Sequence, residues 1–362
     1  MRRFWQRKPL LVRGAFEGFT DPLSRREILA LAAGDELPSR LVQRQGRRWS
    51  LEHGPIAAAR LKRMPARDWT LLLQDTQLAS RACERLLARF DFIPHARVDD
   101  LMVSYAVPGG GVGAHVDSYD VFLLQGSGRR RWQISSQRDH AFRSGLPLKI
   151  LQRFEPEEEW VLEPGDMLYL PPGVAHHGVA LTECLTWSIG FRAPDARDLV
   201  AGFLDELRDT LAPRGTYRDP GAPPARHAGE IPRSLLAHAQ RSARAIRWTR
   251  RELDAFTGRF LTEPKAHVFF EPPARPLAAA AFARRGAALG VALDLKSRLM
   301  FSGTMFHING ETLEPPAIAR PALRRLADAR SIAGPLAAPA EFWAVAHEWY
   351  RRGYLRLQGE ER

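Results

Sequence analysis

The sequence predicts an α+β fold with three parts: an antiparallel β-barrel or sandwich, a helical region and a small mixed α/β module. Three observations support this prediction. Between residues 101 and 192, short apolar runs alternate with Gly and Pro, which is typical of closely spaced antiparallel strands. Residues 195–262 instead carry helical patterns. Residues 263–362 combine a hairpin-like segment with two further helices.

Composition limits the class of protein. A chain of 362 residues with 45% hydrophobic residues can form two or three domains with sizeable cores. The first residues lack the apolar stretch of a signal peptide, and no run approaches the length of a membrane span. The two cysteines, Cys83 and Cys184, form no ligand-like pair, which is typical of a reduced compartment. We therefore expect a cytoplasmic protein without membrane contact.

The charge of the chain is strongly basic. Its net charge is +12, and residues 201–362 carry 25 basic against 17 acidic residues. Such an excess suits an acidic partner, above all nucleic acid or a ribonucleoprotein. An arginine-biased composition with solvated side chains explains the same numbers equally well.

The first elements are predicted in chain order. Residues 20–45 are expected to form a helix, with a cap at Thr20-Asp21-Pro22 before REILALAA. DWTLLLQDT is expected to be an apolar strand. The barrel strands then follow as LMVSYAV, HVDSYDVFLL, RRWQI, EWVLEPG, DMLYLPPG, HHGVAL and LTWSIGF.

The later elements follow a change of pattern at residues 193–194. ARDLVAGFLDELRDTL and RSLLAHAQRSARAIRWTRRELDAFTGRFL are expected to be helical, with a Pro/Gly-rich break between them. A hairpin follows with Asn309-Gly310 as its turn, and PALRRLADAR and APAEFWAVAHEWYRRG are expected to be helices. A short α/β module of this kind resembles a winged helix.

His115 and Asp117 are the first candidates for metal ligands. Both lie in a predicted strand, where side chains two residues apart point to the same face. An isolated pair of this kind is more often an ordinary surface or core pair. A metal site therefore needs a third ligand.

The third ligand is predicted in GDMLYLPPGVAHHG, residues 165–178. Its Gly/Pro spacing up to His176 matches the second sequence motif of the cupin barrel, and a glycine six residues before His115 matches the first. The second His usual in cupins is Asp117 here. Two imidazoles and one carboxylate form the facial triad of non-haem Fe(II) oxygenases. The neighbouring His177 remains an alternative ligand.

The run Arg129-Arg130-Arg131 follows on the next predicted strand. Three protein ligands leave three iron positions, two for a 2-oxo acid and one for O2. The far carboxylate of that acid needs a cation, and the planar fork of an arginine grips a carboxylate with two hydrogen bonds. Alternation places Arg130 opposite its two neighbours, but the apolar positions do not decide which face is inside. Three arginines in a row are also common at a solvated strand end.

These motifs resemble those of the JmjC-type bacterial ribosomal oxygenases, the arginine 3-hydroxylases of a large-subunit ribosomal protein (the sixteenth of that subunit in the family). The similarity includes FWQRKPLLVRGAF, WTLLLQDTQ, DDLMVSYAVPGGGVGAHVDSYDVFLLQGSGRRRWQI, LEPGDMLYLPPGVAHHG and LTWSIGFRAP. It implies a JmjC (cupin) double-stranded β-helix catalytic domain over 1–205, a helical dimerisation region over 206–262 and a winged-helix-like domain over 263–362.

The resemblance also implies ligands for the site. Fe(II) would be held by His115, Asp117 and His176. The co-substrate 2-oxoglutarate would be anchored by Arg130, with Ser104 as a polar partner, and O2 is the second co-substrate.

The substrate arginine would be held by four further residues. Asp100 and Ser188 match the acid and the hydroxyl that bind it, Tyr119 matches the ring against its stem, and Met102 is apolar lining. Asp100 could instead be a loop cap, and Ser188 an ordinary strand hydroxyl.

The resemblance therefore predicts a homodimeric Fe(II)/2-oxoglutarate-dependent dioxygenase that hydroxylates a peptidyl arginine. Arg241, Arg244 and Arg247 are predicted on one helical face, either as the exposed side of a dimer helix or as a contact with ribosomal RNA. One alternative is a basic JmjC/winged-helix protein that binds nucleic acid and keeps a structural metal. Another is an oxygenase that acts on a histidyl residue or a small molecule.

Overall fold

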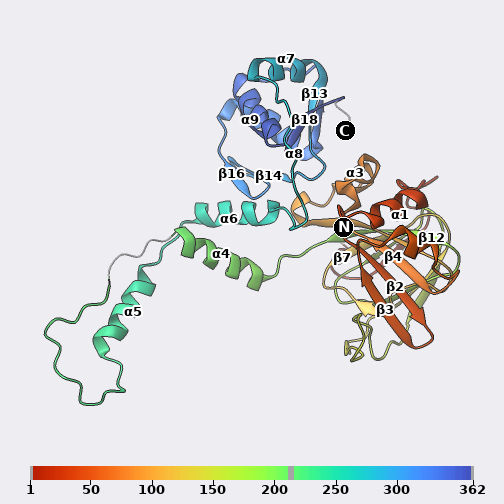
Figure 1. Cartoon of the computed structure of the whole chain (residues 1–362), viewed down its shortest axis with the longest axis horizontal. Helices are drawn as coiled ribbons and strands as arrows, with labels where there is room; N and C mark the ends of the chain where they lie inside the picture. Colours follow the sequence, from red (N-terminus) through yellow and green to blue (C-terminus); the bar gives the residue numbers. More distant parts are fainter. Residues whose placement is uncertain (1–2, 211–215, 360–362) are drawn as a thin grey trace. The chain divides into compact units, whose positions relative to one another are not determined.

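The computed structural model describes residues 3–210 and 216–359, which form two compact units (Figure 1). The first unit comprises Met1–Ala193 with two returning segments, Lys265–Phe270 and Asp294–Lys296. The second comprises Pro194–Pro264, Glu271–Leu293 and Ser297–Arg362. The predicted three-domain boundaries at residues 205 and 262 stay predictions.

The first unit is built from two antiparallel sheets, as the sequence predicted. The eight-stranded sheet has the order β1-β10-β7-β12-β5-β4-β2-β3, and the four-stranded sheet has the order β6-β11-β8-β9. The strands of the larger sheet are β1 (Leu10–Val12), β2 (Ser39–Gln45), β3 (Arg48–His53), β4 (Trp69–Leu73), β5 (Val98–Ala106), β7 (Asp120–Gln125), β10 (Met167–Leu170) and β12 (Cys184–Phe191). Those of the smaller sheet are β6 (His115–Val116), β8 (Arg130–Ser135), β9 (Glu158–Leu162) and β11 (Ala175–Ala180).

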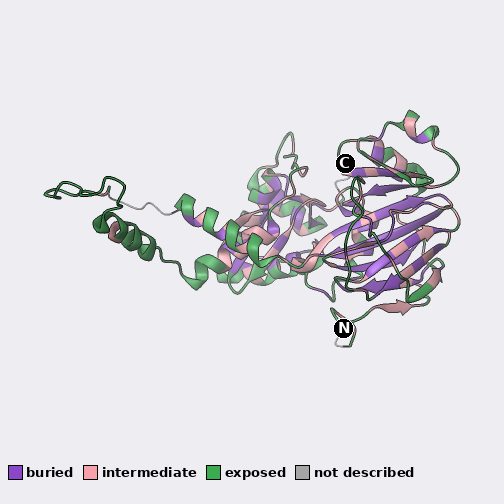
Figure 2. Cartoon of the chain, turned by 90° about the horizontal axis from the view of Figure 1, so that it is seen from below, coloured by how far each residue is buried: buried purple, intermediate pink, exposed green. Residues whose placement is uncertain are grey.

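Alternation along β7 separates two cores. Val121 and Leu123 pack with residues of β8, β9 and β10 inside the barrel. Phe122 and Leu124 point the other way, into the core that helices cover. These helices are α1 (Arg25–Ala33), α2 (Ala58–Lys62) and α3 (Arg81–Ala88), with the short 3₁₀ helices η1 (Thr76–Leu78) and η2 (His95–Arg97). Figure 2 shows the buried barrel strands in purple.

The predicted helix over residues 20–45 is wrong in its second half and at its start. The helix α1 ends at Ala33 before Gly34, and Ser39–Gln45 form β2, because this segment pairs with β3 and β4. The N-cap is Ser24, which forms a capping box with Glu27.

A second difference concerns the run HVDSYDVFLL. It divides into β6 and β7, which belong to different sheets. The arginine run therefore follows β7 rather than the strand that carries His115, and β11 pairs with both β6 and β8. The turn between β6 and β7 directs Asp117 and Tyr119 toward the same interior that His115 faces.

The helical part of the second unit contains α4 (Ala196–Thr210), α5 (Arg233–Ala245) and α6 (Arg250–Thr262). The prediction of one helix across residues 233–262 is wrong, because Thr249 caps a new helix through a capping box with Glu252. Arg247 thus lies outside the helices, while Arg241 and Arg244 lie on α5.

The remainder of the second unit carries the predicted hairpin and helices. Asn309 and Gly310 adopt φ values of 49° and 85° in the turn between β15 and β16, which confirms the turn prediction. The elements are α7 (Ala279–Leu289), β13 (Gly290–Leu293), β14 (Leu299–Ser302), β15 (Met305–Ile308), β16 (Glu311–Leu313), η3 (Ala317–Ala319), α8 (Arg320–Ala329), β17 (Ser331–Ala333), α9 (Ala340–Arg351) and β18 (Leu355–Leu357).

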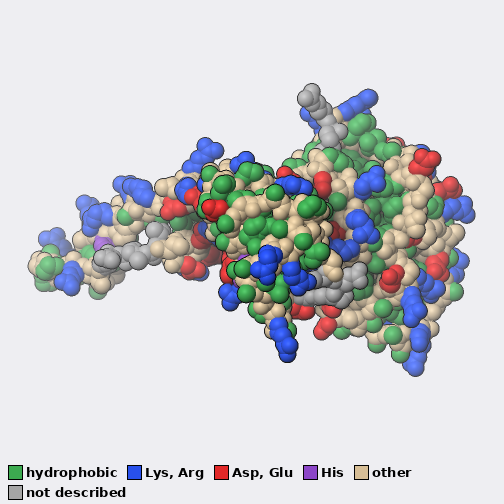
Figure 3. Space-filling model, turned by 90° about the horizontal axis from the view of Figure 1, so that it is seen from above, with side chains coloured by type: hydrophobic (Ala, Val, Ile, Leu, Met, Phe, Trp, Pro, Cys, Tyr) green, Lys and Arg blue, Asp and Glu red, His purple; other side chains and the backbone are tan. Residues whose placement is uncertain are grey.

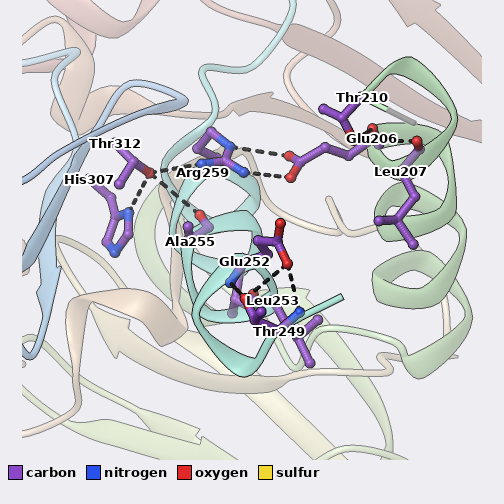
Figure 4. A network of polar contacts seen from close by, with 11 residues as sticks. Glu206, Leu207, Thr210, Thr249, Glu252, Leu253, Ala255, Arg259, His307 and Thr312 are labelled. Carbon is purple, nitrogen blue, oxygen red and sulfur yellow. Dashed lines mark hydrogen bonds and ion pairs between the residues drawn. The ribbon is translucent and has the colours of Figure 1, made fainter. Parts of the chain in front are cut away.

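A polar network joins the helices of this unit to its hairpin (Figure 4). Arg259 on α6 donates two hydrogen bonds to Glu206 on α4, with distances of 3.1 and 2.5 Å, and a third of 3.2 Å to the Thr312 hydroxyl on β16. Thr312 also contacts Nδ1 of the buried His307 at 2.9 Å. Within the described residues, no helix is both long and apolar enough to cross a membrane.

Candidate active site

A cavity of about 530 Å³ opens inside the barrel between its two sheets. Its lining includes every site residue that the sequence predicted. They are Asp100, Met102, Ser104, His115, Asp117, Tyr119, Arg130, His176 and Ser188. One cavity therefore brings together the predicted metal, co-substrate and substrate residues.

The three predicted metal ligands converge on one point. Cross-strand pairing sets His115 on β6 opposite His176 on β11, with ring centroids 4.2 Å apart. The Nε2 atoms of His115 and His176 lie 3.9 and 3.5 Å from Oδ2 of Asp117. One donor atom from each of the three residues lies within 4.8 Å of the others. The alternative ligand His177 does not belong to this group.

Both imidazoles are oriented by backbone carbonyls. Nδ1 of His115 lies 3.0 Å from the Gly113 oxygen, and Nδ1 of His176 lies 3.0 Å from the Val174 oxygen. Because a carbonyl only accepts, Nδ1 donates in each case and Nε2 presents its lone pair to the shared point.

The protonation states of the three predicted ligands are suited to metal binding. Burial, and then the charge of His115, lowers the pKa of His176 to about 3, so this ring is neutral at pH 7 as a metal ligand must be. Burial raises the pKa of Asp117 in the absence of metal, although the charge of His115 and the nearby Tyr119 hydroxyl oppose this. A cation between the three donors would stabilise the carboxylate, so the donor set fits Fe(II).

Arg130 on β8 is buried deep in the same cavity. Its Nη1 donates to the Ser104 hydroxyl on β5 and the Thr186 hydroxyl on β12, both at 3.2 Å. Its Nε has no hydrogen-bond partner, and no carboxylate among the described residues pairs with it. Burial lowers the pKa of this guanidinium. A buried cation without an anion is costly, so this end of the cavity is a site for an anionic ligand.

The parity question of the arginine run is thereby resolved. Arg130 is buried and faces the cavity, whereas Arg129 is exposed. Thr186, two residues before Ser188 on β12, was missed by sequence reasoning. Its place opposite Ser104 in the β5–β12 register is a tertiary feature that no local motif shows.

The cavity lining also includes acidic side chains on β5, four and five residues before Ser104. Asp100 on β5 is buried, and its Oδ2 has no hydrogen-bond partner among the described residues. Burial is the main reason that its pKa rises to about 7. A Cβ at Gly190 would lie 3.2 Å from Asp100 Oδ1 and 3.8 Å from the Tyr119 ring, so glycine keeps this corner open. A buried carboxylate with an unpartnered oxygen beside an aromatic ring is suited to a cationic ligand.

A double-stranded β-barrel that holds two imidazoles and a carboxylate around one point, with a buried arginine further in, defines a JmjC-type oxygenase of the cupin fold. The family model of the JmjC domain matches residues 85–199, and that of the ROXA-like winged helix matches residues 245–356. The predicted fold class is confirmed in both parts.

Known proteins identify the family. The chain is 33% identical over 333 residues to the ribosomal protein uL16 3-hydroxylase of Escherichia coli K12, which covers 90% of this chain and 87% of the relative. The solved structure of E. coli ycfD superposes with a TM-score of 0.86 at 31% identity, over 99% of this chain and 96% of that one. A structure of YcfD with cobalt and 2-oxoglutarate gives a TM-score of 0.83 at 31% identity over 99% and 97% of the two chains. The chain belongs to the JmjC-type ribosomal oxygenases.

Proposed function

We propose that the protein is an Fe(II)/2-oxoglutarate-dependent dioxygenase that adds a 3-hydroxyl group to an arginine of the large-subunit ribosomal protein uL16. The observation that carries the proposal is the content of the cavity. It holds a metal-ligand triad, a buried arginine whose Nε has no partner among the described residues, and a buried acid whose Oδ2 has none there either. The substrate class is supported by the E. coli relative, whose name gives it as a uL16 3-hydroxylase.

His115, Asp117 and His176 would hold the iron. When bound, iron together with O2 and 2-oxoglutarate supplies the oxidising chemistry. The contribution of the triad is to present two neutral nitrogens and one carboxylate from one side. This arrangement would leave room for co-substrates to bind the same ion.

Arg130 would bind the far carboxylate of 2-oxoglutarate. Ser104 and Thr186 accept hydrogen bonds from its Nη1. Its Nε has no partner in the described part of the chain and can donate to a ligand carboxylate. The apolar walls of the barrel, including Val121 and Leu123, exclude water and so strengthen this ion pair.

Asp100 would pair with the guanidinium of the substrate arginine. Tyr119 would lie along its stem, Ser188 would offer a hydroxyl, and Met102 would complete the apolar wall. An acid at this place favours a cationic side chain over a small neutral molecule. It distinguishes the proposal from an oxygenase for histidyl residues, which are mostly neutral at pH 7.

The test is hydroxylation of a uL16 peptide with purified protein, followed by succinate formation and by mass spectrometry of the arginine. Asp117→Ala is expected to abolish substrate-stimulated succinate formation. Asp100→Asn is expected to raise KM for the peptide while the affinity for 2-oxoglutarate stays unchanged. Turnover that persists in Asp117→Ala would contradict the mechanism. Salt-dependent nucleic-acid binding by a wild type without hydroxylase activity would favour the nucleic-acid-binding alternative.

We also propose that the protein forms a homodimer through its helical region. This region exposes large apolar side chains to an extent that is unusual for a monomer. They are Val200 and Leu204 on α4, Leu235 and Leu236 on α5, and Ile231, Ile246 and Trp248 outside the helices. No residue of α5 is buried (Figure 2).

The described part of the chain around α5, residues 216–249 (called the arm below), is also basic. Basic side chains are spaced along the face of this arm seen in Figure 3, and Arg218, Arg226, Arg233, Arg241, Arg244 and Arg247 are all exposed. They would remain available for ribosomal RNA if the apolar side chains form the dimer contact. A ribosomal substrate implies that the protein works in the cytoplasm.

A further inference from the structure

The short segment Lys265–Phe270 belongs to the first unit, although it follows α6 in sequence. Two of its side chains contact acids beside the active-site cavity. Nζ of Lys265 donates to Asp75 Oδ1 at 2.8 Å and lies 3.4 Å from Asp99 Oδ1. Nε2 of His267 lies 3.3 Å from Asp75 Oδ2. The proposed function assigns no role to either residue.

Asp75 connects this segment to the substrate acid. It is buried, and it adopts a left-handed backbone conformation, with φ 56° and ψ 30°, in the turn after β4. This conformation is unfavourable for a residue other than glycine, so its surroundings must hold it. The backbone of Asp75 lies close enough to the carboxylate of Asp100 to lower its pKa. A shift of this turn would therefore change the surroundings of Asp100.

A further link passes through Gln77. Its amide nitrogen lies 3.3 Å from Asp75 Oδ1, and its amide oxygen accepts from the backbone N–H of Leu101 at 2.9 Å. Asp75 is thus linked to β5 on both sides of Asp100. Gln77 connects it to Leu101, and Lys265 connects it to Asp99. Lys265 supplies the cation in this arrangement of buried acids.

The charges around Asp100 are not balanced without that lysine. Burial raises the pKa of Asp100, the charge of Lys265 lowers it, and the charges of Asp75 and Asp99 raise it again, to about 7. Burial opposes the charge on Lys265, but attraction from the three acids outweighs this and raises its pKa. The titratable and charged groups around Asp100 are Asp75, Asp99, Tyr119 and Lys265. In addition, His267 contacts Asp75, and Arg192 lies near Asp99.

We propose that Lys265 is a positioning residue for substrate binding: it holds the Asp75 turn against Asp100 and offsets the charges of Asp75 and Asp99, so that Asp100 is ionised when the substrate cation arrives. The inference rests on the proposed function, because it concerns the residue that would bind the arginine. Lys265 itself does not line the cavity.

The experiment measures kcat and KM for a uL16 peptide between pH 6 and pH 9. Removal of the cation in Lys265→Gln is expected to move the acidic limb of kcat/KM upward by about one pH unit. If the pKa of Asp100 rises by about one unit from about 7, its ionised fraction at pH 7 falls about fivefold, and KM should rise about fivefold. At saturating peptide, kcat should change less than about twofold.

Two variants serve as controls. Lys265→Arg keeps the cation and should restore the wild-type profile. Lys62→Gln removes the same charge from the exposed end of α2 and should leave both constants unchanged.

A second variant, expected to shift the pH profile in the opposite direction, keeps the inference testable if Lys265→Gln does not fold. Asp99→Asn removes a like charge next to Asp100 and should move the acidic limb to lower pH. Unchanged limbs in folded Lys265→Gln or in Asp99→Asn would overturn the inference. A wild-type protein that does not hydroxylate the peptide would instead overturn the proposed function, so the two failures are distinguishable.

Discussion

Replacement of Arg130 by methionine should affect stability and co-substrate binding in opposite directions. The Arg130 guanidinium is buried with two hydroxyl partners, and no carboxylate of residues 3–210 or 216–359 pairs with it. Removal of such a charge relieves a desolvation cost of several kcal/mol, and methionine fills much of the same volume. Loss of the donor leaves the Ser104 hydroxyl less well satisfied, at a cost of about 1 kcal/mol.

The net expectation for Arg130→Met is a gain of about 1 to 3 kcal/mol in the free energy of unfolding. For a unit of this size each kcal/mol raises Tm by about 2 to 4 °C. Binding of 2-oxoglutarate should weaken by about 2 to 5 kcal/mol, roughly 30- to 5000-fold in Kd, because the bound dianion loses its buried cation.

The assays are thermal unfolding in the presence of a chelator and calorimetric titration of 2-oxoglutarate into the protein loaded with Mn(II). Arg129→Met is the matched control, since this neighbouring side chain is exposed, and it should change neither quantity. A lower Tm combined with an unchanged Kd in Arg130→Met would show that the arginine supports the fold rather than the co-substrate.

Three further predictions concern the second unit. Gly258→Ala should lower the free energy of unfolding by about 1 to 3 kcal/mol in thermal denaturation, because the added Cβ would overlap the ring of His307. Burial, and then the charge of Arg259, lowers the pKa of His307 below the value of about 6.5 in the unfolded chain, so stability should fall as the pH drops below 6.5. In urea denaturation between pH 7 and pH 5, His307→Gln should lose less stability than the wild type, and equal losses would contradict this. Leu236→Asp should shift the mass in light scattering from dimer toward monomer, whereas an unchanged mass would exclude α5 from the interface.

The sequence predicted best where the decisive signal is local. Period-2 apolar runs with Gly and Pro between them predicted the strands, and the spacing of two motifs predicted that His115, Asp117 and His176 converge. The inward direction of Arg130 could not be derived from its own strand. It depends on the register with β11 and β9 on either side.

The errors arise where tertiary contacts decide between two local possibilities. Residues 39–45 carry Leu41 and Val42, which suit a helix or a strand, and pairing with β4 selects the strand. The contact of Lys265 with Asp75 joins residues separated by 190 positions, and no local sequence pattern predicts it. Thr186 and the role of Gln77 were missed for the same reason.

The return of Lys265–Phe270 to the first unit also affects how the protein is made. A chain emerges from the ribosome with its N-terminal part first, at about 5 to 20 residues per second. Asp75 and Lys265 are separated by 190 positions, so roughly 10 to 40 s pass between their syntheses. The last barrel strand, β12, ends at Phe191, so for the final part of this interval, roughly 4 to 15 s, the barrel strands are complete but the acids beside Asp100 lack their lysine. A nascent barrel can therefore fold before its substrate pocket is finished, and the enzyme reaches full activity only when its C-terminal half has been made.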